Sequence, residues 1–377
     1  MYKRKRFVVR GICFVLMLSL IAPLYPSEIM AQSEWEEPGV YPVSPSDDEW
    51  KTMTFSELLE SANMPEEVLK ETSTEMLLKW VMEYPFLADV AAHDLPEDGI
   101  EWLKQTSNIC REFMSRDDSR RILIDFYFSL NYEELDRSTL FRYKTFFNAY
   151  FSSVGKNMSN DEIQIVKQID QIQKQAGVTA LNGLLLDEQS FEEKKVAVEG
   201  AKGVTSGFIN SGVIKTSIYD TLCFYGSYNK YGASASGCYK YISGEASSTE
   251  IEAADEYFQS THMLWFKLYS ASKKYNCNAF AWIDASSSNS FILLHPDAYT
   301  NSSQVSLVNT NGSAVNGDKI VLYNSSGTSV HSLIAISSGN NSSSILTKSK
   351  IGSFGVYMAS LSAVMLDYGV TTYKVYR

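Results

Sequence analysis

The stretch Gly317-Asp-Lys-Ile-Val-Leu-Tyr-Asn-Ser-Ser-Gly-Thr-Ser-Val-His-Ser-Leu-Ile-Ala-Ile336 decides the fold of the second half of the chain. It contains two short apolar runs, Lys319–Tyr323 and Val330–Ile336, and both are rich in β-branched and long aliphatic residues. Gly and Ser residues bound both runs and favour turns. The pattern therefore predicts two β-strands joined by a turn.

The rest of residues 201–377 has the same character, since it is rich in Ser, Gly, Thr, Asn and Tyr and carries few charges. Within it, Thr249–Gln259 has a helical pattern, and a short helix is expected to begin at Cys277. The Ser- and Asn-rich segments 286–290 and 338–344 are expected to be loops. Helices packed on an antiparallel sheet predict an α+β domain over residues 201–377.

Residues 51–200 have a different composition and are expected to form an acidic, all-helical domain. They contain apolar residues at helical spacing, and they carry three potential capping boxes, Thr54-x-x-Glu57, Thr72-x-x-Glu75 and Ser159-x-x-Glu162. Residues 32–200 hold 33 acidic and 16 basic side chains, whereas residues 201–377 hold 10 and 12. This step in charge indicates two regions with different surfaces.

The first 31 residues resemble an export signal. Lys3, Arg4, Lys5, Arg6 and Arg10 form a basic segment, and an apolar run of about 13 residues follows, shorter than the roughly 20 that span a bilayer. Residues 1–31 are therefore expected to be a cleaved signal peptide. The protein is then secreted, extracellular or associated with a cell wall, and has no stable membrane anchor. The proline-rich, acidic residues 32–50 are expected to be a disordered linker.

Composition sets limits on function. The chain has 377 residues, of which 45% are hydrophobic, enough for one or two cores. The formal net charge of -11 argues against a nucleic-acid partner, because phosphate binding needs clustered Lys and Arg.

The cysteines that remain after signal removal are Cys110, Cys223, Cys238 and Cys277. Cys110 lies in a helical pattern and is expected to be a small buried hydrophobic residue. A disulfide between Cys223 and Cys238 is one possibility, and the pairing stays open at this point. His93 is expected to be a surface or capping residue.

Cys277 carries the strongest chemical signal, because it stands where a polar loop gives way to a helical run. A thiol at a helix N-terminus meets the positive end of the helix dipole, which favours the reactive thiolate. His331, on the second strand of the decisive stretch, could share the proton. The alternative is that Cys277 is an ordinary buried cysteine and His331 a polar residue at a strand end.

The order of motifs in residues 205–377 resembles the NlpC-type and CHAP-type papain-like cysteine peptidases. The motifs are Tyr275-Asn-Cys277, Gly317-Asp-Lys319, His331-Ser332 and Ser349-Lys-Ile-Gly352, followed by Gly355-Val-Tyr357. The resemblance implies a papain-like domain in which Cys277 attacks an amide carbonyl and His331 manages the proton. It also implies a third polar group on the following strand, for which Ser349 is chosen among Ser344, Thr347 and Ser349.

The same resemblance places the oxyanion of the intermediate near the Cys277 backbone N–H, with Asn276 or Tyr275 as further donors. The chain departs from the family pattern after the cysteine, where Asn278 stands in place of a frequent His, and in the late motif, where Ile351 replaces a Trp. Asp318 is expected to be a turn residue. No metal site and no cofactor are expected, because His262 and His295 lack neighbours at metal-ligand spacing.

Three interpretations of function follow. The first is a secreted cysteine hydrolase that cleaves an amide bond in peptidoglycan peptides or proteins. The second is a catalytically inactive cell-wall- or protein-binding module of the same fold. The third makes the acidic helical region an interaction domain with the hydrolase as an accessory. The order of the regions further suggests that the helical region covers the catalytic domain and regulates it within the molecule.

Overall fold

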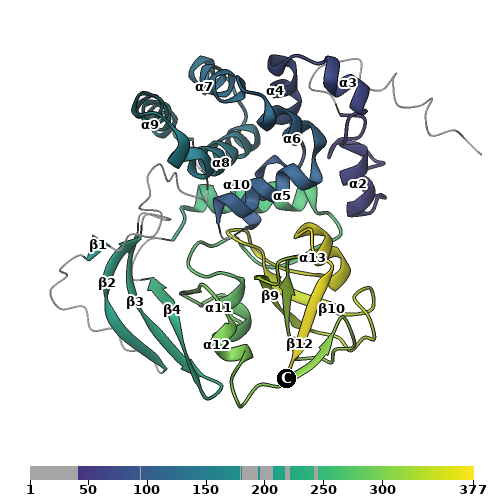
Figure 1. The fold of residues 1–377 in the computed structure, drawn as a ribbon, viewed down its shortest axis with the longest axis vertical. Helices are drawn as coiled ribbons and strands as arrows, with labels where there is room; N and C mark the ends of the chain where they lie inside the picture. Colours follow the sequence, from purple (N-terminus) through teal and green to yellow (C-terminus); the bar gives the residue numbers. More distant parts are fainter. Residues whose placement is uncertain are drawn as a thin grey trace, which may run out of the picture. The chain divides into compact units, whose positions relative to one another are not determined.

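The computed structural model describes residues 41–377, apart from residues 94, 179, 181–193, 196–206, 217–220 and 242–244. The predicted signal peptide therefore lies outside the described residues. Within them, a helical region precedes antiparallel sheets and their helices, as the α+β prediction requires (Figure 1). None of the described helices is long and apolar enough to cross a membrane.

Short helices make up the N-terminal region. They are α2 (Phe55–Ser61), α3 (Glu66–Glu71), α4 (Thr74–Glu83), the 3-10 helix η1 (Leu87–Ala92), α5 (Pro96–Thr106), α6 (Asn108–Ser115), α7 (Ser119–Ser129), α8 (Arg137–Val154), η2 (Gly155–Asn157) and α9 (Asn160–Gln175). The predicted capping boxes at Thr54 and Ser159 are both formed. The helix predicted to start at Thr72 is α4, and it starts one residue later, since the Ser73 hydroxyl accepts from the Met76 N–H and caps it.

Residues 41–50 pack against this region, so the predicted disordered linker is wrong for its second half. The Tyr41 hydroxyl donates to the Trp80 carbonyl at 2.7 Å, and the Trp50 ring stacks on Phe86. Both side chains are buried. The acidic and proline-rich composition of the segment predicted disorder, although Tyr41 and Trp50 attach it to the helical region. Residues 32–40 lie outside the part of the chain that the structure describes.

Strands dominate the C-terminal region. The smaller sheet has the order β1 (Lys194–Lys195), β2 (Phe208–Thr216), β3 (Thr221–Lys230), β4 (Ala233–Tyr241) and β6 (Phe291–Leu293). The larger sheet has the order β5 (Phe266–Tyr269), β11 (Val356–Ser360), β10 (Leu346–Lys350), β9 (Ser329–Ala335), β8 (Lys319–Tyr323), β12 (Thr372–Tyr376) and β7 (Leu307–Thr310). The pairs with printed registers in both sheets are antiparallel. The two predicted strands are β8 and β9, which pair directly.

The C-terminal helices are α10 (Ser248–Thr261), α11 (Cys277–Trp282), α12 (Asp297–Thr300) and α13 (Leu361–Asp367). The larger sheet has a core on each face. On one face, α11 and residues of the smaller sheet pack against Val321 and Ile334. On the other, α10, α13 and parts of the helical region pack against Leu322 and Leu333. Neighbouring residues of one strand thus belong to different cores, as strand alternation requires.

The predicted boundary near residue 200 separates helices from strands but does not separate two packing units. The described residues belong to one compact unit, and Ala88, Ala91 and Phe141 of the helical region lie in the same core as Tyr257 of α10. In Figure 1, the green helix α10 lies beside the blue helices of the N-terminal region. The helical region is thereby part of the structure that supports the larger sheet.

Candidate active site around Cys277

Cys277 is the first residue of α11, as predicted. The Asn276 side chain caps this helix, because its Oδ1 accepts from the Ala279 N–H at 3.0 Å. Cys277 is only 2% exposed. The thiol thus stands at the expected helix start but within the core rather than at the surface.

The sheet residue that meets α11 is Ser332. The Trp282 Nε1–H donates to the Ser332 hydroxyl at 3.1 Å, and that hydroxyl donates to Asn278 Oδ1 at 2.6 Å. On the neighbouring strand, Lys348 and Lys350 point to the same face, since their ammonium groups lie over the rings of Phe280 and Tyr275. The side chains facing the Cys277 helix are therefore a hydroxyl, aliphatic groups and two lysines.

His331 lies on the opposite face of the sheet. Its ring stacks on Tyr368, which follows α13, with ring centroids 4.1 Å apart, and its register partner Leu322 belongs to the core on that side. Successive side chains of a strand point to opposite faces, so the neighbour of Ser332 must point away from α11. The structure does not bring His331 to Cys277, and the predicted dyad is not assembled.

Ser349 also lies on the side away from α11. Its register partner is Tyr357, and Thr347 on the same face donates to the Ala359 carbonyl at 3.0 Å. Neither ring nitrogen of His331 has a hydrogen-bond partner among the described residues. Ser349 therefore does not orient the imidazole, and the predicted third catalytic residue is also misplaced.

The two predicted oxyanion donors have other roles. Asn276 Nδ2 donates to the Leu293 carbonyl at 2.9 Å, while its Oδ1 accepts from the Leu293 N–H at 3.2 Å, in addition to the helix cap. These bonds tie α11 to β6. Tyr275 is 2% exposed and lies beneath the Lys350 ammonium. Asn276 therefore fixes the start of α11, and the Tyr275 ring stacks on Phe280 of the same helix.

His93 was expected to be a surface or capping residue, and it is the C-cap residue of η1, with its ring packed against Trp102 and Tyr368. Cys110 is fully buried as predicted, and burial raises its pKa to about 12. Cys238 is a buried thiol outside any disulfide. In the β3–β4 register Cys238 lies opposite Gly226, whereas Cys223 lies opposite Tyr241, so the hairpin does not align the two cysteines.

The environment of His331 predicts a pH effect on stability. Burial, with a smaller contribution from His93, lowers the His331 pKa to about 3, below the roughly 6.5 of an unfolded histidine. The folded state then binds fewer protons, so this contribution to stability is complete above pH 6.5 and is lost as the pH falls toward 3.

We expect His331→Phe, which keeps a ring against Tyr368, to flatten the fall in unfolding free energy below pH 6.5. The difference in slope should approach about 1.4 kcal/mol per pH unit. Urea denaturation at several pH values measures it, with His295→Phe at an exposed position as the control. Equal slopes for His331→Phe and the unmodified chain would show that His331 is not buried in its neutral form.

A pocket lies away from Cys277, between the N-terminal helices and the end of α10. Its volume is about 330 Å³, and its lining includes Trp50, Phe55, His262, Leu264 and Trp265. Sequence reasoning missed this pocket. The apolar run Met263-Leu-Trp-Phe-Lys-Leu-Tyr269 was a signal that could have pointed to it.

The same run exposes large apolar side chains next to the pocket. Leu264 is 70% exposed and Phe266 62%, and Met263 and Leu268 are also exposed. Phe266 and Leu268 lie on β5, an edge strand of the larger sheet. An apolar patch on an edge strand is typical of a surface that binds another protein.

Comparisons with known proteins give no match: no family model, no curated protein and no solved structure resembles the chain. The resemblance to papain-like peptidases thus stays a prediction.

Proposed function

We propose that this chain is a binding module without turnover, the second of the interpretations that the sequence left open. The observation that carries the proposal is the separation of Cys277 and His331 by the larger sheet. A cysteine nucleophile needs a base within hydrogen-bond reach, about 2.6–3.2 Å. A base on the other side of a β-sheet cannot act on the thiol without refolding of β9.

The burial of Cys277 supports the same proposal. A substrate carbonyl must reach the sulfur, whereas Cys277 is 2% exposed and belongs to the helix that fills the core between the two sheets. The hydroxyl of Ser332 and the cap by Asn276 hold this helix in place. In this proposal Cys277 packs in the core rather than attacking a carbonyl.

The exposed edge of the larger sheet supports a protein as the partner. Strand β5 pairs only with β11 among the described strands, so its other edge is open to an additional strand. An extended peptide can pair with such an edge through main-chain hydrogen bonds, and its apolar side chains can contact Phe266 and Leu264. We therefore propose an extended, apolar segment of a partner protein as the ligand. The predicted signal peptide would direct the module out of the cell.

The test combines a turnover assay and a binding assay on the purified chain. We expect no soluble product from peptidoglycan or casein, and the same result for the Cys277→Ser variant. We expect selection from a random-sequence peptide library to yield apolar, extended peptides that bind the unmodified chain.

The Phe266→Asp variant should weaken that binding at least tenfold, because it places a charge at the centre of the apolar patch. Leu307→Asp is the matched control, since Leu307 is 54% exposed on β7 at the other edge of the sheet. Turnover that depends on Cys277 and His331 would instead support the hydrolase interpretation. Binding to peptidoglycan alone would support a cell-wall module.

A further inference from the structure

Three titratable side chains meet in the core between the helical region and α13. They are Asp89 of η1, His262 directly after α10, and Asp367 at the end of α13. Their side chains are at most 2% exposed. His262 Nε2 lies 3.4 Å from Asp89 Oδ2 and 3.4 Å from Asp367 Oδ1. Burying two carboxylates and an imidazole requires a compensating cation, either a proton or a metal ion.

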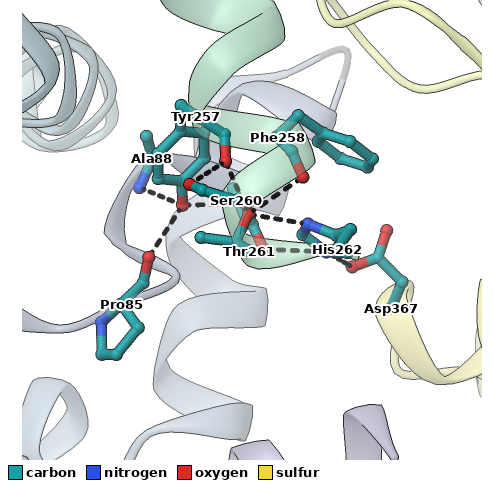
Figure 2. A network of polar contacts seen from close by, with 9 residues as sticks. Pro85, Ala88, Tyr257, Phe258, Ser260, Thr261, His262 and Asp367 are labelled. Atoms are coloured by element: carbon teal, nitrogen blue, oxygen red, sulfur yellow. Dashed lines mark hydrogen bonds and ion pairs between the residues drawn. The ribbon is translucent and has the colours of Figure 1, made fainter. Parts of the chain in front are cut away.

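The other ring nitrogen of His262 shows which atom faces the carboxylates. Nδ1 lies 2.9 Å from the Thr261 hydroxyl, and that hydroxyl is within donating distance of the Tyr257 and Phe258 carbonyls. We assign the single hydroxyl proton to a carbonyl, which can only accept, so that the hydroxyl oxygen accepts from Nδ1–H. Figure 2 shows this network, with Asp367 directed at the His262 ring from α13.

This arrangement leaves Nε2 directed at two carboxylate oxygens. A charge-assisted N–H···O bond is usually about 2.7–2.9 Å long, so both 3.4 Å separations are too long for one. Nε2 and Asp89 Oδ2 accordingly have no hydrogen-bond partner among the described residues. By contrast, two ligand atoms each about 2.0–2.2 Å from a tetrahedral metal ion lie roughly 3.3–3.6 Å apart.

From this geometry we infer that Asp89, His262 and Asp367 form a binding site for a divalent transition metal such as Zn²⁺. One imidazole nitrogen and two carboxylate oxygens are a donor set that suits Zn²⁺, while Mg²⁺ and Ca²⁺ prefer oxygen ligands alone. Asp367 Oδ2, which has no hydrogen-bond partner among the described residues, or a water molecule can complete the coordination. The inference does not depend on the proposed binding function.

The surroundings of the three residues have the features of a metal site. The Tyr257 hydroxyl donates to Asp89 Oδ1 at 2.9 Å, and Thr261 fixes the His262 ring, as outer-shell residues do around metal ligands. The rings of Phe55, Phe86 and Phe258 pack around His262. His262 also contributes to the lining of the 330 Å³ pocket.

A metal at this position would connect three segments that are far apart in the chain. Asp89 belongs to the helical region, whereas His262 and Asp367 belong to the region of the larger sheet. Metal binding to the folded state alone raises stability by mass action. The site is therefore expected to strengthen the attachment of the helical region to the sheet.

The test uses Co²⁺ as a spectroscopic probe on the full chain after dialysis against a chelator. We expect one equivalent of Co²⁺ to bind with visible absorption, Zn²⁺ to displace it, and Zn²⁺ to raise the melting temperature. Asp367→Asn, which keeps the shape and removes the charge, should weaken binding at least tenfold. The exposed Asp297→Asn is the control.

A second variant keeps the test decisive if Asp367→Asn does not fold. Thr261→Val removes the acceptor for Nδ1–H without touching a ligand, and it should weaken binding 10- to 100-fold. Absence of Co²⁺ and Zn²⁺ binding by the unmodified chain would overturn the inference and assign the cluster to a protonated histidine between two carboxylates. Binding that both variants leave unchanged would overturn it as well.

Discussion

A chain that starts at residue 201 is expected not to fold. It lacks Ala88, Ala91 and Phe141, which share the core with α10 and the larger sheet. The Tyr368 hydroxyl donates to the Ala92 carbonyl at 2.9 Å, and this buried hydrogen bond would be lost. Loss of a buried Phe side chain costs about 3–5 kcal/mol, and each buried polar group left unpaired costs about 1–3 kcal/mol. The total is comparable with the 5–15 kcal/mol that stabilises a typical domain.

Circular dichroism during heating measures this effect. We expect no cooperative transition for the chain from residue 201, and a normal transition for a control chain that starts at residue 38, where the compact unit begins. The idea that the helical region is a removable cover makes the opposite prediction. A shortened chain that melts cooperatively near the temperature of the full protein would contradict the shared core described here.

Gly352→Ala is expected to destabilise the protein by about 2–5 kcal/mol. Gly352 has a φ of +44°, and an added Cβ would lie 2.2 Å from the Ala91 carbonyl oxygen and 2.4 Å from the Ala92 carbonyl carbon. The left-handed conformation costs a residue with a Cβ about 1–2 kcal/mol, and forcing an extra atom into a packed core costs a further 1–3 kcal/mol. The backbone of η1 and the turn before β11 would have to separate.

Gly327→Ala is the matched control for this substitution. Gly327 also has a positive φ, +79°, but an added Cβ would meet no atom within 4 Å. It should therefore show the conformational cost alone, about 1–2 kcal/mol. Urea denaturation of both variants gives the difference. Equal losses of stability would mean that the helical region does not approach Gly352 as closely as the structure indicates.

The sequence predicted the strands β8 and β9 well but not the faces of β9. Gly and Ser turns bound both apolar runs, so the positions of the two strands could be predicted from the sequence. The run from Leu333 to Ala335 is buried on both faces of the sheet. A strand buried on both sides has no polar alternation, and a shift of one residue exchanges its faces. Sequence alone therefore could not tell whether His331 or Ser332 meets α11.

The register between β8 and β9 determines which of His331 and Ser332 faces α11. It shifts between Leu322 and Tyr323, so that Leu322 pairs with His331 and Tyr323 with Ser329. The shift lies beyond His331, and the regular pairs before it place Ser332 opposite Val321 of the α11 core and His331 opposite Leu322 of the other core. A pattern of turns and apolar residues does not reveal this register.

The Asp89, His262 and Asp367 cluster could not be predicted from spacing for a different reason. Its members come from three elements and lie more than 100 residues apart, so no local motif marks them. Sequence spacing therefore gives His262 no ligand neighbours. Only the packing of η1 and α13 around the end of α10 brings the three side chains together.

The most direct test of the central claim is iodoacetamide labelling of the folded chain at pH 6, with peptide mass mapping of Cys277. An unperturbed thiol, with a pKa of about 8.5, reacts slowly at this pH. We predict that Cys277 reacts no faster than the buried Cys110 and Cys238, and that His331→Ala does not change its rate. Fast labelling of Cys277 that falls in the His331→Ala variant would show an activated cysteine–histidine pair and contradict the account.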